Sequence, residues 1–241
     1  KRSASQIHLS KLEICRERSF IICKKKLEIK VKLRVLSLVF FLEDNMKYRI
    51  ITISREFGAG GHTVGKELSG NLGIPVFDGE IIKKVAMESG LSEKFIEEKG
   101  EYGKKSVFEN YFSAGMYYKG PSLEDEIWAV QTKIVRELAE KEPCIIIGRC
   151  ADFILKERDD VLDVFLHASC ENRIKRLVSE GVDLGKKPEK FLKDRDCRRS
   201  SYVHFYTDMK WGEARNYDMS LDTGKLGIEK CAELIESVYK N

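Results

Sequence analysis

The sequence lacks any CxxC pair, although it contains seven cysteines, and it has only four histidines. The cysteines are scattered and odd in number, at positions 15, 23, 144, 150, 170, 197 and 231. This spacing argues against a zinc site. Unpaired thiols fit a reducing compartment, and we therefore expect a cytoplasmic protein.

A long hydrophobic run is also missing. The longest, LRVLSLVFFL, has ten residues, which is about half of the ~20 that a membrane-spanning helix needs. No small-residue cleavage site follows it, which argues against a signal peptide. A net positive charge is missing outside residues 1–45, because the remaining chain carries 32 basic and 34 acidic residues. We therefore expect neither a membrane nor a nucleic acid as partner of the main body.

Residues 1–45 differ from the rest in composition. They contain 11 Lys and Arg, 5 Asp and Glu, and no glycine or proline. One hypothesis is that the native domain is 46–241, beginning at Met46, and that the extension is disposable or a start-site artefact. The other is that residues 1–45 form a basic amphipathic segment that docks on the domain or on a membrane surface.

In the main body, short apolar runs alternate with helical patterns, which is typical of βαβ units. The middle runs are almost continuously apolar, as strands of a parallel sheet covered on both faces are. Residues 79–142 form a long, mostly helical insertion. Residues 180–215 are polar, with little core, and are expected to be a mobile lid. The predicted strands are 49–54, 75–77, 143–148, 161–167 and 217–222.

The stretch SREFGAGGHTVGKE, residues 54–67, follows the first predicted strand and has the composition of a phosphate-binding loop. In one register it matches GxxxxGK with Lys66 as the loop lysine. In the other the loop begins at Arg55 and the helix near Gly61, which keeps the whole apolar stripe of Val64, Leu68 and Leu72. The second register joins strand to helix more tightly, and we favour it.

In that register the loop, REFGAGGHT, resembles the GxxGxGKGT variant of nucleoside monophosphate kinases. Gly58, Gly60 and Thr63 match it, and Gly61 stands in place of the lysine. Further motifs follow in the order and approximate spacing of the cytidylate kinase-like family of P-loop kinases. They are FDG at 77–79, GRCAD at 148–152, FLHASCENRIKR at 165–176, DRDCRR at 194–199 and YDMSLDT at 217–223. The resemblance covers roughly residues 48–238.

The resemblance implies a three-layer α/β/α P-loop kinase fold with a five-stranded parallel sheet, a helical NMP-binding insertion (79–142) and a lid (180–215). It implies ATP with Mg²⁺ as cofactors and CMP or a related nucleotide as acceptor. It assigns ATP phosphates to Gly58, Ala59, Gly60, Gly61, His62 and Thr63, the adenine side to Asp222 and Thr223, the monophosphate to Asp78, Arg149 and Asp152, and Mg²⁺ to Thr63 with waters. The catalytic residues implied are Arg173, Arg195 and Arg199. We add Arg55 to them as a hypothesis of our own, because the family pattern has a glycine at that position.

The missing lysine leaves two functional hypotheses open. In the first, Arg55 at the loop entrance supplies the lost positive charge, helped by lid arginines, and the chain is an active kinase. In the second, the chain is a catalytically weak or inactive nucleotide-binding or regulatory protein of the same fold. A nucleic-acid or membrane-surface adaptor that uses the basic N-terminus is a third class, which the neutral-to-acidic main body opposes.

Overall fold

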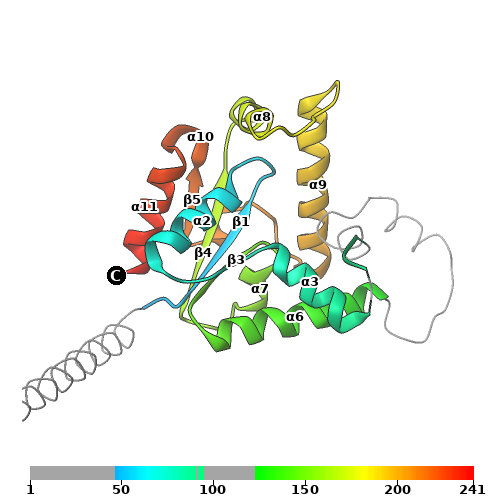
Figure 1. The fold of residues 1–241 in the computed structure, drawn as a ribbon, viewed down its shortest axis with the longest axis vertical. Coiled ribbons are helices and arrows are strands. Elements are labelled where there is room, and N and C mark those ends of the chain that lie inside the picture. The colour runs from blue at the N-terminus through cyan, green and yellow to red at the C-terminus, as the bar shows by residue number, and fades with distance from the viewer. Residues whose placement is uncertain (1–46, 91, 95–122) are drawn as a thin grey trace, which may run out of the picture. The chain divides into compact units, whose positions relative to one another are not determined.

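The computed structural model describes residues 47–90, 92–94 and 123–241 (Figure 1). They belong to Lys47–Asn241, one of two units into which the chain divides. The predictions for residues 1–45 and for the middle of the insertion, 95–122, lie outside the described residues. Within the described ranges, no helix is long and apolar enough to cross a membrane.

Five parallel strands form one sheet in the order β2-β3-β1-β4-β5. They are β1 (Ile50–Arg55), β2 (Val76–Phe77), β3 (Cys144–Ile147), β4 (Val161–His167) and β5 (Met219–Asp222). All five predicted strands are confirmed, and their ends differ from the prediction by two residues at most. β1 and β3 are buried along their whole length, as expected for central strands covered on both faces.

Helices cover both faces of the sheet and confirm the three-layer α/β/α fold (Figure 1). One face carries α2 (Gly61–Leu72) and α11 (Ile228–Tyr239). The other carries α3 (Gly79–Ser89), α6 (Leu123–Lys141) and the short α7 (Ala151–Ile154). Near the carboxyl ends of the strands lie α8 (Cys170–Ser179), α9 (Pro188–Thr207) and α10 (Thr223–Leu226). A 3₁₀ turn at Ala214–Asn216 precedes β5.

Helix α2 shows how the apolar stripe fixes the position of the loop. Val64 and Leu68 are fully buried, while Leu72 is half-buried at the last turn. Gly65 lies so close to Ile147 of β3 that a Cβ there would be 2.8 Å from the Ile147 Cδ1 atom. The helix therefore packs tightly on the centre of the sheet, with its first residues at the carboxyl end of β1.

Helix α9 corrects one expectation about the 180–215 segment. The segment was predicted to have little core, yet α9 is anchored at both ends. Near its start, Leu192 is buried with Leu177 and Leu184. Near its end, Tyr202 is buried, and Tyr206 stacks on Trp128 of α6 with ring centroids 4.3 Å apart. The apolar residues of this segment are sparse and separated by charged ones, so the sequence pattern does not indicate a core. They contact their apolar partners only in the folded chain.

Candidate functional site

The turn from β1 to α2 has the geometry of an anion-binding loop. Gly58 and Gly60 have φ angles of 79° and 82°, in the left-handed region that glycine tolerates best. Ala59 between them is fully buried. The helix begins at Gly61, which confirms the second register, and Lys66 lies exposed on the second turn of α2.

The start of α2 is electrically suited to a phosphate. Its first turn has no acidic residue, and Gly60 at the N-cap position supplies no side-chain cap. The backbone N–H groups of a helix start carry partial positive charge and bind anions readily. His62 and Thr63 are exposed on this turn, so a bound phosphate group can reach it.

Arginines from α8 and α9 hold the loop backbone. Their guanidinium groups donate to three backbone carbonyl oxygens. Arg199 donates to the carbonyl of Arg55 at 2.9 Å, Arg173 to that of Phe57 at 3.3 Å, and Arg176 to that of Gly58 at 2.8 Å. These bonds link segments more than 100 residues apart. They bring positive charge from two helices onto one short stretch of backbone.

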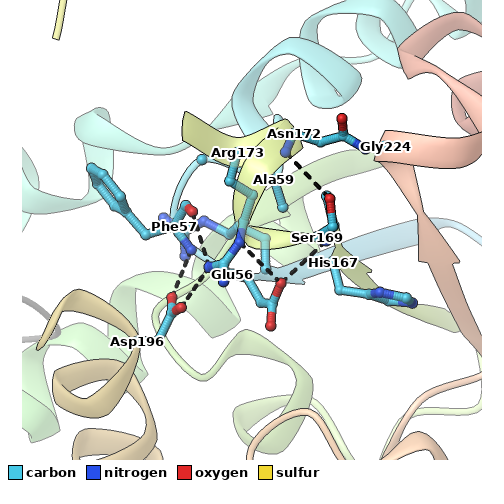
Figure 2. A network of polar contacts seen from close by, with 12 residues as sticks. Glu56, Phe57, Ala59, His167, Ser169, Asn172, Arg173, Asp196 and Gly224 are labelled. Atoms are coloured by element: carbon cyan, nitrogen blue, oxygen red, sulfur yellow. Dashed lines mark hydrogen bonds and ion pairs between the residues drawn. The ribbon is translucent and has the colours of Figure 1, made fainter. Parts of the chain in front are cut away.

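An ion-pair network joins the same elements (Figure 2). Arg173 donates to the Asp196 carboxylate at 2.5 Å, and its Nε atom lies 3.5 Å from Glu56. Asp196 also accepts from the Phe57 N–H at 2.8 Å, and Glu56 accepts from the Ala168 N–H at 3.1 Å. Arg173 is therefore fixed between the loop and α9 by charge-assisted bonds.

The Phe57 ring contacts the guanidinium groups of Arg195 and Arg199. The Arg195 guanidinium lies 5.4 Å from the centroid of the Phe57 ring and 5.2 Å from that of Phe191, so it contacts two aromatic rings that also pack against each other. Arg199 lies 5.5 Å from the same Phe57 centroid. Such cation–π contacts orient a guanidinium without neutralising its charge. The structure therefore brings all four predicted catalytic arginines to the loop.

Arg55 lies on the side of the loop that faces β2. Its side chain is nearly enclosed, and its Nη2 atom is 4.0 Å from Asp78 Oδ1. The other oxygen of Asp78 is 3.3 Å from His62 Nδ1. The predicted acceptor residue Asp78, at the N-cap position of α3, thus lies beside the start of α2.

The predicted Asp222-Thr223 turn lies against the other side of the loop. The Thr223 hydroxyl is buried and within donating distance of the Ala59 carbonyl, at 2.7 Å. It also accepts from Arg176 at 3.2 Å. Asp222 caps α10 by accepting from the Gly224 N–H at 2.9 Å. Thr223 is therefore part of the loop's support and Asp222 fixes the turn that carries it, while the contact of both residues with adenine stays a prediction.

Arg149 and Asp152 lie after β3, on the face of the sheet that α6 covers. Arg149 is 2% exposed with a φ of 63°, and its carbonyl accepts from the buried Gln131 of α6. Asp152 is 6% exposed and accepts from Ser54 at 3.3 Å. Both side chains are enclosed to a degree typical of residues that support a fold, so their role in monophosphate binding stays a prediction.

Sequence reasoning gave no role in the site to Arg176, Glu56 and Phe57. Arg176 was seen only as sharing a helix face with Arg173, yet it bridges the loop and Thr223. Glu56 and Phe57 lie inside the loop motif, at positions where the pattern permits any residue. An acid directly after Arg55 was the available signal, because an acid inside an anion-binding loop needs a cation to offset it.

ATP with Mg²⁺ fits the residues present. The helix start without acids and the nearby guanidinium groups suit the phosphates. Thr63, exposed on the first turn, offers a hydroxyl to a metal ion. In the described part of the chain, no group of three or more His, Cys, Asp or Glu side chains is arranged to hold a metal. Mg²⁺ here would thus be held mainly by phosphates and water, as is usual for this ion.

A comparison with protein families shows which family carries this loop and fold. The family model described as cytidylate kinase-like matches residues 50–225. The chain belongs to the cytidylate kinase-like family. This membership confirms the predicted resemblance and supports a kinase-type phosphotransferase function. The search of curated proteins found no match.

Several solved structures are similar to this chain. A protein described as uncharacterized from Eubacterium ventriosum ATCC 27560 is 28% identical, with a TM-score of 0.58 over 80% of this chain and 98% of the other. Shikimate kinase from Acinetobacter baumannii in complex with shikimate is 15% identical, with a TM-score of 0.46 over 82% and 96%. A gluconokinase from Sinorhizobium meliloti 1021 is 17% identical, with a TM-score of 0.44 over 81% and 98%.

Proposed function

We propose that this protein transfers the γ-phosphoryl group of ATP to CMP or a related (deoxy)nucleoside monophosphate. The observation that carries the proposal is the gathering of four arginines around one glycine-rich loop at a helix start. Phosphoryl transfer requires little covalent chemistry from the protein and depends mainly on positioning and on positive charge. Arg55, Arg173, Arg195 and Arg199 come from three elements and meet that requirement together.

The donor side is the loop and the first turn of α2. When bound, ATP supplies the γ-phosphoryl group, and Mg²⁺ neutralises part of its charge. Gly58 and Gly60 allow the backbone to turn so that successive N–H groups can surround a phosphate. Arg173 and Arg176 keep that backbone in place through its carbonyl groups.

The acceptor side lies between the end of β2 and the arginines of α8 and α9. Asp78 at the end of β2 marks one boundary. A cavity of about 350 Å³ borders the other, lined by Arg173, Lys193, Asp196, Ser200 and Trp211. Its volume is at the low end of the range for small-molecule sites. Arg173 and Lys193 line this cavity and would hold a monophosphate, while the lid helix α9 beside it would exclude water during transfer.

A substrate panel tests the proposal. ATP with Mg²⁺ is offered to the full chain with CMP, dCMP, UMP or AMP, and ADP formation is followed by a coupled assay. We expect turnover with CMP or dCMP to exceed that with AMP. The control is Gly60→Ala, where the φ of 82° and a Cβ 2.5 Å from the Ile228 Cδ1 atom would distort the loop. Turnover with none of the four monophosphates, or turnover with AMP that equals or exceeds that with CMP and dCMP, would overturn the acceptor assignment. Turnover that survives Gly60→Ala would overturn the assignment of the loop as the donor site.

One observation favours a second function, that of a nucleotide sensor without kinase activity. Gly61 stands where the kinases carry the lysine that contacts the β- and γ-phosphates. Tight ATP binding without ADP formation for any monophosphate would support the sensor and exclude the kinase. The retained arginine cluster favours the kinase, because a sensor needs no charge on a transferring group.

A further inference from the structure

The space beside Gly61 is already filled by another side chain. A Cβ built on Gly61 would lie 2.8 Å from Arg55 Cγ and 3.3 Å from both Cβ and Cδ of Arg55. These atoms belong to the stem of Arg55, close to its backbone, and they cannot move aside cheaply. The loop therefore does more than lack a lysine, because no side chain fits at residue 61 while Arg55 keeps its place.

The direction of Arg55 follows from the strand. Along β1, Ile53 and Arg55 lie on the same face, since side chains alternate. Ile53 pairs with Ile147 of β3, against which α2 packs. Arg55 therefore points toward the start of α2, passes over Gly61 and ends beside Asp78.

Three contacts hold this arrangement. The Arg55 carbonyl accepts from Arg199 at 2.9 Å, which fixes the backbone at the loop entrance. The guanidinium group pairs with Asp78 at 4.0 Å, and Asp78 is itself paired with His62 on the first turn of α2. The side chain is 8% exposed, so its position is set by packing rather than by solvent.

We infer that Arg55 replaces the loop lysine as the cation on the β- and γ-phosphates, that Gly61 is required to make room for it, and that Asp78 is its positioning residue. This inference rests on the proposed function, because it assigns a phosphate-contacting role within the same site. A guanidinium is planar and presents several donors, so it can contact two phosphate oxygens at once where an ammonium is a point charge.

The arrangement predicts that a lysine is tolerated at residue 61 only when the side chain of Arg55 is removed at the same time. Gly61→Lys alone places a side chain against Arg55 and should impair the site. The double variant Arg55→Gly with Gly61→Lys removes the obstacle and restores the glycine and lysine of the family loop. We expect the double variant to recover about tenfold over Gly61→Lys in affinity for the triphosphate.

The experiment measures binding and turnover on the full chain. Binding of a non-hydrolysable ATP analogue with Mg²⁺ is compared with binding of AMP, which lacks the β- and γ-phosphates. For Arg55→Met we expect analogue affinity to fall about tenfold with AMP affinity nearly unchanged, and turnover to fall about 100-fold. Asp78→Asn should show a smaller loss of analogue affinity. The matched control is Lys66→Met, which removes the exposed lysine of the other register.

The possible outcomes separate the inference from the proposed function. Circular dichroism and thermal unfolding confirm that each variant is folded, and the neutral, polar Arg55→Gln replaces Arg55→Met if the latter is not. Unchanged analogue binding in a folded Arg55 variant, or a double variant no better than Gly61→Lys, overturns the inference whatever the wild type catalyses. Arg55-dependent binding without wild-type turnover overturns the kinase and retains the inference. A wild type that binds no analogue overturns both.

Discussion

The molecule holds buried arginines at the carboxyl edge of the sheet and aspartates on its face. The two groups find different kinds of hydrogen-bond partner. At the edge, Arg173 and Arg199 are at most 9% exposed and donate to loop carbonyls. On the face of the sheet, Asp163 of β4 accepts from the Thr52 hydroxyl of β1, and Asp152 of α7 accepts from Ser54. Thr52 and Ser54 are two residues apart and share one face of β1.

The difference lies in what each environment does to charge. Carbonyl oxygens and carboxylates stabilise a guanidinium as a cation, so the edge keeps its positive charge for an anionic ligand. Inside the sheet, burial raises the pKa of Asp163 to about 7, and the bond from Thr52 offsets only part of that effect. The nearby carboxylates of Asp152 and Asp218 raise the pKa further. The arginines at the edge therefore stay charged and can bind an anionic ligand, whereas burial favours the neutral, protonated form of the Asp163 carboxyl.

The largest expected effect is at the edge. Arg199→Ala removes a cation and leaves the Arg55 carbonyl without the guanidinium donor that fixes the loop entrance. We expect kcat/KM for the phosphoryl transfer to fall about 100-fold. The coupled assay measures it, with Lys190→Ala, an exposed position on the first turn of α9, as control. Unchanged kcat/KM in a folded Arg199→Ala protein would show that the edge charge is structural only.

The second effect is in the interior and depends on pH. The unfolded Asp163 carboxyl ionises near its ordinary pKa of 3.8, whereas the folded one stays protonated up to about 7. The stability it contributes is therefore fully present below pH 3.8 and is lost as the pH rises to 7. Asp163→Asn should abolish this fall and leave the variant more stable than wild type by roughly 2 kcal/mol at pH 8.

Urea unfolding at several pH values checks this prediction. Asp159→Asn, an exposed change just before β4, is the matched control and should leave the pH profile unaltered. If wild type and Asp163→Asn gave parallel profiles between pH 4 and 8, the carboxyl would be ionised in the folded protein. The proposed contrast between edge and interior would then fail.

The smallest effect is that of the hydroxyl partner. Thr52→Val removes the donor to Asp163 and should cost about 1 kcal/mol of unfolding free energy. Because that bond lowers the Asp163 pKa, its loss should also move the pH-dependent fall to higher pH. Urea unfolding at pH 5 and pH 8 measures both. In the Asp163→Asn background the pH-dependent part of the effect should vanish, and its persistence would place its origin elsewhere.

Much of the fold could be predicted from the sequence because its signals are local. The apolar runs of β1, β3 and β4 are nearly continuous, and burial on both faces demands that pattern. Ser169 caps α8 by accepting from the Asn172 N–H, which is a position where serine is strongly preferred. The second register was preferred on the apolar stripe of α2, and the helix does begin at Gly61.

The site could be predicted only in part. The arginines near the loop were found from motifs, but their partners were not, because a charged residue carries no sign of what it will meet. Arg195 was expected to act on the nucleotide, and in the structure its guanidinium packs against the rings of Phe57 and Phe191. The core of α9 was underestimated, since Tyr206 gains its stacking partner from α6, some 80 residues earlier in the chain.

The sequence by itself determined the strand order along the chain, the absence of a loop lysine and the point at which α2 begins. All three depend on neighbouring residues, through side-chain periodicity and backbone preference. Only the tertiary structure decided that Arg55 fills the space over Gly61 and that Arg199 holds its carbonyl. Arg199 and Arg55 are 144 residues apart, and such a contact exists only when the packed sheet and helices bring both segments to one edge.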